Sequence, residues 1–129
     1  GAGELQDLLV AADPDSSPLP LYQVVARAVA EQWNANGNCA LVVGATYPGE
    51  LRAVRALVGD LPILVPGIGA QGGDLAATLD AGLDRRGQGL IISASRSVLY
   101  ASSGPDFAQA ARAEALRLHA AISHNRSGA

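Results

Sequence analysis

The chain has 129 residues, the length of a single domain, and a formal net charge of −3. All nine basic residues are arginines, and they are dispersed along the chain, which disfavours a nucleic-acid-binding surface. Cys39 is the single cysteine, so an intrachain disulfide is excluded; the residue is expected to pack as a small hydrophobe at the start of a strand. No apolar run has the length of a membrane span or the pattern of a signal peptide, and a soluble cytoplasmic protein is expected.

Residues 1–37 are predicted to form a helical lead-in. Residues 1–10 have the pattern of a short helical or irregular segment, and residues 13–18 that of a polar loop interrupted by prolines. Apolar residues then recur at helical spacing and predict one buried helix face, formed by Leu21, Val24, Val25, Ala28, Val29 and Trp33. This helix should end within residues 34–37, because Asn and Gly tolerate left-handed backbone.

Residues 38–123 contain three repeats of a strand followed by a helix. The first repeat has a strand at 40–44 and a helix that begins at Pro48 and ends at Gly59. The inner face of this helix is expected to consist of Leu51, Val54 and Leu57. The repeat predicts that each strand is covered by the helix that follows it.

The second repeat has a short apolar strand at 63–65, a glycine-rich turn, and a helix capped by Asp74 that stops near Gly87. The inward residues of this helix are expected to be Leu75, Thr78, Leu79 and Gly82. A strand that passes through such a turn into a helix N-terminus is a ready anion site, because free N–H groups and the helix dipole favour negative charge.

The third repeat has a strand at 89–93, a polar turn at 95–97 and a last helix that begins at Pro105. The apolar stripe of this helix is predicted to be Phe107, Ala111, Leu118 and Ile122. Residues 124–129 are expected to be a frayed tail.

Alternation of continuous apolar strands with helices predicts an α/β fold with a parallel sheet covered by helices. Ligands of such sheets bind at the carboxyl ends of the strands, which here carry Thr46, the turn at 69–73 and residues 93–96. The second and third strands should be neighbours, so their exit turns should face each other.

Together, the two neighbouring turns predict a phosphate site. Gln71 is the long polar side chain of the glycine turn, and Arg96 has the planar fork that suits a phosphate. Taken singly, each turn has a structural alternative. The glycines would serve a tight connection with positive φ, and Arg96 would be a surface residue or the partner of Asp74 in a salt bridge.

Three motifs, in this order and spacing, resemble the last three βα units of orotidine 5′-phosphate decarboxylases of the second, bacterial class. They are VVGATYP at 42–48, LVPGIGAQGGD at 64–74, and SRS at 95–97 followed by Tyr100. The resemblance covers nearly the whole chain. It implies a (β/α)₈ TIM barrel, of which residues 1–129 would be the C-terminal portion with about three parallel strands and covering helices.

The resemblance also implies roles for particular residues. Gln71 would span from the pyrimidine ring to the phosphate, Arg96 would hold the phosphate, and Pro66 would lie beside the ring. Backbone N–H groups completing the phosphate cradle are expected from Gly72, Gly73 and Ser95.

The implied reaction is that of a carboxy-lyase in pyrimidine biosynthesis: it removes the carboxylate of orotidine 5′-phosphate to give uridine 5′-phosphate and CO₂, without metal or organic cofactor. The family's alternating lysines and aspartates are missing here, since the chain has no lysine and no DxKxxD pattern. The serine-bearing loop that closes on the pyrimidine is missing as well. A full barrel needs about 250 residues. We therefore expect no catalytic residue in this chain, which would bind the phosphate end but not decarboxylate alone.

Three strands of an opened barrel leave two bare edges and an uncovered inner face, which favours association. The expected partners are the nucleotide, the missing N-terminal portion of the barrel or a second copy, and a homodimer of the complete protein; nucleic acid and membranes are not expected.

Other interpretations remain open. One is another phosphate-binding barrel enzyme, and another is a non-catalytic phosphate-binding α/β module. A dinucleotide-binding domain is disfavoured because no acidic residue is placed to bind a ribose.

Overall fold

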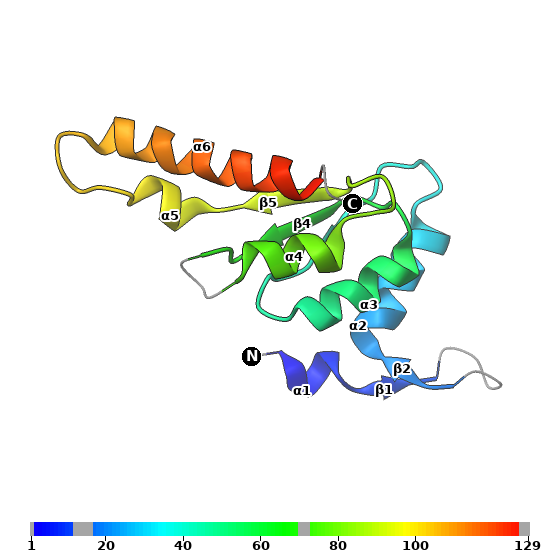
Figure 1. Ribbon diagram of the computed structural model, residues 1–129. Helices are drawn as coiled ribbons and strands as arrows, with labels where there is room; N and C mark the ends of the chain where they lie inside the picture. The colour runs from blue at the N-terminus through cyan, green and yellow to red at the C-terminus, as the bar shows by residue number, and fades with distance from the viewer. Residues whose placement is uncertain (1, 12–16, 70–72, 127–129) are drawn as a thin grey trace.

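Three parallel strands form the centre of the computed structural model, which describes residues 2–11, 17–69 and 73–126 (Figure 1). The strands lie side by side in the order β3-β4-β5. Their bounds are Leu41–Val42 for β3, Ile63–Pro66 for β4 and Leu90–Ser93 for β5. This order confirms the predicted parallel sheet and the predicted adjacency of the second and third strands.

The pairing of β3 with β4 continues beyond the two residues of β3 itself. The Val43 N–H donates to the Leu64 carbonyl and the Ala45 N–H to the Pro66 carbonyl, both at 3.0 Å. The extended segment therefore agrees with the strand expected at 40–44.

Helices α3 (Pro48–Val58) and α4 (Leu75–Gly82) cover one face of this sheet. α3 has its proline in the first turn and ends at Gly59, whose φ of 62° is in the left-handed region. α4 begins after Asp74, whose carboxylate accepts the Ala77 N–H at 3.1 Å. Both helix starts confirm the sequence-based expectations.

α4 ends earlier than expected, at Gly82 rather than near Gly87. The backbone becomes extended at Leu83, and the Asp84 carboxylate then accepts the N–H groups of Arg86 and Gln88, each at 2.8 Å. These bonds give the backbone a local alternative to the helix, which is why the helical pattern does not continue.

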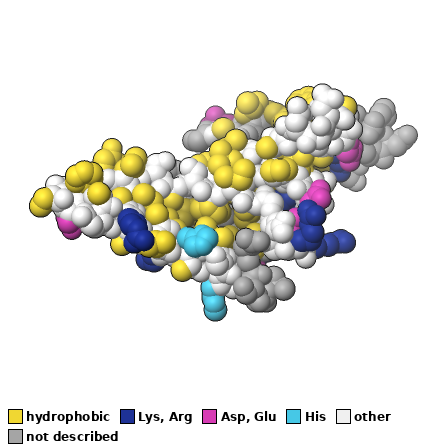
Figure 2. All heavy atoms as spheres, turned by 90° about the horizontal axis from the view of Figure 1, so that it is seen from above, with side chains coloured by type: hydrophobic (Ala, Val, Ile, Leu, Met, Phe, Trp, Pro, Cys, Tyr) yellow, Lys and Arg dark blue, Asp and Glu magenta, His cyan; other side chains and the backbone are white. Residues whose placement is uncertain are grey.

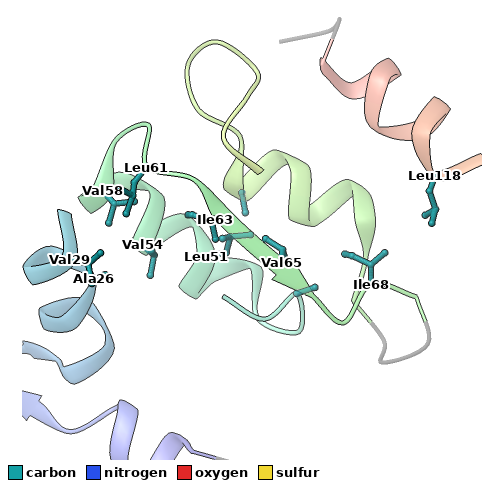
Figure 3. Close-up of a cluster of buried hydrophobic side chains, with 12 residues drawn as sticks. Ala26, Val29, Leu51, Val54, Val58, Leu61, Ile63, Val65, Ile68 and Leu118 are labelled. Atoms are coloured by element: carbon teal, nitrogen blue, oxygen red, sulfur yellow. The ribbon is translucent and has the colours of Figure 1, made fainter. Parts of the chain in front are cut away.

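The core lies between the sheet and these helices (Figure 3). Ile63 and Val65 alternate along β4 and are both fully buried, and they meet the buried face of α3. That face consists of Leu51, Val54 and Val58, whereas the expected Leu57 is half-buried. In α4 the buried residues are Thr78, Leu79, Ala81 and Gly82, and the expected Leu75 is half-buried.

The opposite face of the sheet is not covered within the described part of the chain. Val42 pairs with Leu64, and Leu64 pairs with Ile91, so the three form one row across the sheet. Val42 is 68% exposed and Ile91 is 55% exposed. We call this row the bare face.

The C-terminal region differs from the prediction at two points. Residues 95–97 belong to a short helix, α5 (Ser95–Leu99), rather than to a turn, and the last helix, α6, spans Phe107–Arg126 and does not begin at Pro105. α6 therefore continues into the segment that was expected to be frayed.

The predicted stripe of α6 is partly wrong. Leu118 is buried, but Phe107 is 62% exposed, because the connection from α5 to α6 extends past the sheet (Figure 1). Seen from above, on the side of α6, hydrophobic side chains run across much of the surface (Figure 2).

The lead-in is not entirely helical. It contains α1 (Gly3–Gln6), an antiparallel pair formed by β1 (Leu9–Val10) and β2 (Leu19–Pro20), α2 (Leu21–Ala28) and a π-helical segment, η1 (Val29–Trp33). The expected buried face is wrong at Val25 and Trp33, which are 42% and 62% exposed. Trp33 belongs to η1, where the wider turn of a π-helix ends the 3.6-residue spacing on which that expectation depended. The helical region ends at Asn34, as expected.

Cys39 is half-buried against the core, and its thiol donates to the Trp33 carbonyl at 3.5 Å. Among the described residues, no helix combines the length and the apolar character needed to cross a membrane.

Candidate phosphate-binding site

The turn that follows β4 is closed by two backbone hydrogen bonds. The Gly69 N–H donates to the Gly73 carbonyl at 3.0 Å, and the Gly73 N–H donates to the Gly67 carbonyl at 3.2 Å. Gly67 and Gly69 have φ values of 98° and 73°, which glycine adopts without steric cost. The turn therefore requires glycine at these two positions for conformational reasons.

Gly73 is required for a different reason, namely space. A Cβ atom at this position would lie 2.6 Å from the Ala45 Cβ and 2.6 Å from the Gly67 carbonyl oxygen. The turn is thus packed directly against the end of the neighbouring β3 segment. The Gly73 N–H donates to the Gly67 carbonyl in this structure. Gly73 therefore allows the close packing of the turn and does not offer a free N–H group.

Two of the residues predicted to bind phosphate, Gln71 and Gly72, lie outside the described residues. Their roles remain predictions. The turn that contains them is described at both of its ends, Gly69 and Gly73, and these ends fix where its backbone enters and leaves.

Arg96 lies in the first turn of α5, directly after β5. Its side chain is exposed, and the described part of the chain offers it no ion pair. The Asp74 carboxylate caps α4. The described residues therefore do not include the Asp74–Arg96 salt bridge that the sequence left open as an alternative. No side chain caps α5, which begins at the exposed Ser95. First-turn N–H groups of a helix have no partner within it, so the start of α5 presents donors together with the Arg96 guanidinium.

The structure brings the two predicted turns together. Pro66 at the end of β4 pairs with Ser93 at the end of β5, so both chains leave the sheet at the same level. A Cβ atom on Gly69 would lie 3.8 Å from the Cβ of Ser97, one residue beyond Arg96. Gly69 and Ser97 also line the same hollow, so the glycine turn and α5 lie side by side.

Pro66 lies on the same side of the sheet as the bare face. Side chains alternate along a strand, so Pro66 shares its side with Leu64, while Ile63 and Val65 point to the helices. The half-buried Pro66 thus lies at the carboxyl end of β4 next to Ser93. This is the side that faces the interior when a sheet closes into a barrel.

The burial of two polar side chains, those of Ser97 and Arg55, was not predicted from the sequence. The Ser97 Oγ is buried and has no hydrogen-bond partner, which no sequence pattern signals. Arg55 is buried at the opposite end of the sheet. The sequence could have predicted this burial, because Arg55 follows Val54 within the apolar face of α3.

Arg55 joins the ends of four elements through its guanidinium. Its Nε donates to the Gly82 carbonyl at 2.6 Å, and its Nη2 donates to the Gly89 carbonyl at 2.8 Å. Its Nη1 donates to the carbonyls of Gly59 and Leu61 at 2.8 and 2.7 Å. Burial lowers the pKa of Arg55, an effect that the nearby Asp84 and Asp60 oppose. An open hollow of about 640 Å³ beside it is lined by residues that include Asp60, Asp84 and Arg86.

The glycine turn has the G-x-G-x-x-G spacing of dinucleotide-binding turns, at Gly67, Gly69 and Gly72. However, the next strand, β5, ends in Ser93 and not in the acidic residue that would bind a ribose hydroxyl. The spacing therefore does not change the interpretation of this turn as a site for a phosphate group.

A parallel sheet with helices on one face and a bare opposite face has the arrangement of one portion of a (β/α)₈ barrel. The comparisons agree. A solved Leishmania donovani OMP decarboxylase superimposes with a TM-score of 0.79 and 42% sequence identity, over 98% of this chain and 44% of that chain. A Toxoplasma gondii protein described as a putative orotidine-monophosphate-decarboxylase superimposes with a TM-score of 0.75 and 33% identity, over 98% of this chain and 46% of that chain.

Sequence comparison identifies the family more closely. The orotidine 5′-phosphate decarboxylase of Cellvibrio japonicus is 57% identical over 122 residues, which are 95% of this chain and 42% of that protein. That of Azoarcus sp. (strain BH72) is 63% identical over 102 residues, which are 79% of this chain and 38% of that protein. No family model matches the chain. The chain is thus homologous to orotidine 5′-phosphate decarboxylases and spans about two-fifths of the length of these curated relatives.

Proposed function

We propose that this chain supplies the phosphate-binding part of an orotidine 5′-phosphate decarboxylase. The observation that carries the proposal is the position of the glycine turn after β4 beside the helix that bears Arg96, since Gly69 and Ser97 line one hollow. Two loops of this kind, side by side at the carboxyl ends of parallel strands, suit the phosphate of a nucleotide. The family likeness supports the choice of orotidine and uridine 5′-phosphate as that nucleotide.

In this proposal Arg96 makes charge-assisted hydrogen bonds to the phosphate, because its fork matches two phosphate oxygens. The N–H group of Ser95 adds a donor at the start of α5, and Gly72 adds one from the glycine turn. Gln71 reaches from the phosphate to the pyrimidine, and Pro66 packs beside the ring. Gly73 contributes by keeping the turn close to Ala45, because the space there admits no Cβ.

The chemical step would be performed elsewhere. Decarboxylation gives uridine 5′-phosphate and CO₂, and a proton must replace the lost carboxylate on the ring carbon. In the family a lysine supplies that proton, and this chain contains no lysine. Residues 1–129 would therefore act as the C-terminal portion of one barrel domain, binding substrate without metal or cofactor and remaining inactive alone. A cytoplasmic location belongs to the same proposal and rests on the likeness to enzymes of pyrimidine biosynthesis.

The partner proposed for the chain is the remainder of the barrel. Within the described part of the chain, β3 and β5 each pair with a strand on one side alone, so each has an open edge. The bare face adds exposed Val42 and Ile91, which water solvates poorly. Strands that close the barrel would pair with both edges and cover this face, and the complete protein would then form a homodimer. A second copy of this chain is the competing occupant, and light scattering with and without the complementary segment separates the two.

A chimera tests the function directly. The aligned segment of the Cellvibrio japonicus enzyme is replaced by this chain, to which it is 57% identical. We expect the chimera to decarboxylate orotidine 5′-phosphate, measured by the loss of substrate absorbance, within about tenfold of the parent rate, a loss of about 1.4 kcal/mol in transition-state stabilisation.

The matched control is the same chimera with Arg96→Ala, which should raise the substrate concentration needed for half-maximal rate. A chimera that folds and does not decarboxylate, beside an active parent enzyme, would contradict the proposal. It would instead favour a phosphate-binding module without catalysis.

A further inference from the structure

A hollow of about 300 Å³ lies beside β3, where the lead-in approaches the sheet. Leu41 and Val43 belong to the helix-covered side of β3, and Val42 belongs to the bare face. All three residues line the hollow, together with Gly44. Because residues of both faces of β3 contribute, the hollow lies at the edge of this strand.

The lead-in supplies further apolar lining. Leu5 comes from α1, and Leu21 and Val25 come from α2. Leu5 is 60% exposed and Val25 is 42% exposed, although both lie beside the sheet. Burial of such side chains by an apolar partner is favourable, since it removes their surface from water.

The backbone of β3 is paired on one side. The N–H groups of Leu41, Val43 and Ala45 each donate to a carbonyl of the β4 segment at 3.0 Å. In a parallel ladder, the residues between them direct their N–H and C=O groups to the other side. Val42 and Gly44 therefore present backbone donors and acceptors at an edge where, in the part of the chain that is described, no strand pairs with β3.

We propose that this hollow seats one β-strand from the remainder of the barrel, and that the strand pairs in parallel with β3 through the backbone of Val42 and Gly44. This inference rests on the proposed function and deepens it, since it assigns the groups that bind the proposed partner. Side chains alternate along a strand, so every second side chain of the bound strand would pack against Leu21 and Val25. Those side chains should therefore be apolar.

The relatives have enough additional chain to supply this strand. The 122 residues aligned with the Cellvibrio japonicus enzyme are 42% of that protein, so more than half of it lies outside the aligned region. A (β/α)₈ barrel has eight parallel strands, of which β3, β4 and β5 are three. A second copy of this chain suits the hollow less well, because it would bring its own lead-in to an edge where α1 and α2 already lie. A single strand has no such obstruction.

The first test measures assembly. The probe is the remainder of the Cellvibrio japonicus enzyme outside the aligned region, co-expressed with the 129-residue chain and purified as a complex. Val25→Asp would place a carboxylate in the hollow, and we expect it to weaken the complex by about 30-fold or more. The matched control is Trp33→Asp, which alters another exposed apolar side chain of the lead-in, one that does not line this hollow. It should change the affinity by less than about threefold.

The second test is amide hydrogen exchange, which needs no variant. In the free chain, the N–H groups of Val42 and Gly44 should exchange faster than those of Val43 and Ala45, whose N–H groups are bonded to β4. In the complex, we expect exchange at Val42 and Gly44 to slow by about tenfold or more. Protection at these two positions supports pairing of a strand with this edge.

Four results would overturn the inference. They are failure of the unaltered chain to form the complex, a complex in which Val42 and Gly44 exchange as fast as in the free chain, equal weakening by Val25→Asp and Trp33→Asp, and protection in the free chain that rises with its concentration. The last result would assign the edge to a second copy. Failure of the proposed function is separate, because it would appear as a folded chimera in which Val42 and Gly44 are protected and orotidine 5′-phosphate is not decarboxylated.

Discussion

The two ends of the sheet use arginine in opposite ways. At the amino ends of the strands, Arg55 is 8% exposed and its guanidinium donates to four backbone carbonyls. At the carboxyl ends, Arg96 is exposed, has no ion pair among the described residues, and is followed by an unsatisfied Ser97 hydroxyl. At the amino ends the guanidinium is fully hydrogen-bonded to the protein, whereas at the carboxyl ends the Arg96 guanidinium has no ion pair among the described residues.

The difference separates stability from binding. Arg55 satisfies carbonyls at the ends of α3 and α4, where the helix dipoles favour a cation. The start of α5 leaves N–H groups and the Arg96 guanidinium without a protein partner among the described residues, and because they are exposed to water they are available to a bound anion. Residues at the amino ends should therefore change the free energy of unfolding, whereas those at the carboxyl ends should change ligand affinity.

The strongest challenge to this comparison is Arg55→Ala. Loss of the guanidinium leaves four carbonyls without their donor, and we expect the free energy of unfolding in urea to fall by about 3–5 kcal/mol. The control is Arg52→Ala on the same helix, where an exposed arginine pairs with Asp80. That variant should change stability by less than about 1 kcal/mol. Similar losses of unfolding free energy in both variants would mean that the hydrogen bonds of Arg55 to the four carbonyls do not stabilise the amino end of the sheet.

Gly73→Ala tests whether the glycine turn depends on close packing. The added methyl group would meet the Ala45 Cβ and the Gly67 carbonyl oxygen, and we expect a loss of about 2–3 kcal/mol in unfolding free energy. Gly49→Ala is the control, because nothing lies within 4 Å of a Cβ at that helical position. It should stabilise the protein by about 0.5–1 kcal/mol. A stable Gly73→Ala variant would show that the turn can move away from β3.

Arg96→Ala addresses binding at the carboxyl end. We expect affinity for uridine 5′-phosphate to fall about 30- to 100-fold, with the free energy of unfolding nearly unchanged. Arg112→Ala, which removes an exposed arginine of α6, should leave the affinity unaltered. Calorimetric titration at two salt concentrations provides the measurement. If both variants bind equally well, the phosphate does not lie on Arg96.

The smallest expected effect is a pH dependence at the amino end. The backbone hydrogen bonds from Gln88 and Arg86 hold the pKa of Asp84 below its ordinary value of 3.8, and its side chain is 5% exposed. A carboxylate with a lowered folded-state pKa stabilises the protein above the unfolded pKa. This contribution is lost as the pH falls through the folded value.

Asp84→Asn should therefore lower the melting temperature near pH 7 and make little difference well below about pH 3. Melting curves across this range provide the measurement. A constant difference between the two proteins at every pH would contradict the assignment to Asp84.

Local sequence patterns predicted much of the fold correctly. The start of α3 at Pro48, its end at Gly59 and the cap at Asp74 were predictable because capping depends on a few adjacent residues. The end of α4 was not, because the side-chain bonds of Asp84 compete with the helix there. The exposure of Phe107 also depended on how far α6 extends past the sheet, which no periodicity encodes.

The sequence by itself determined the order of β3, β4 and β5, the helices α3 and α4 that follow the first two of them, and the family likeness, since these depend on residue type and spacing along the chain. The tertiary structure alone decided that Gly69 and Ser97 line one hollow, that Gly73 has no room for a side chain, and that Arg55 joins four chain segments. Most of these contacts join residues far apart in the sequence, and their distances follow from the packing of the sheet against its helices.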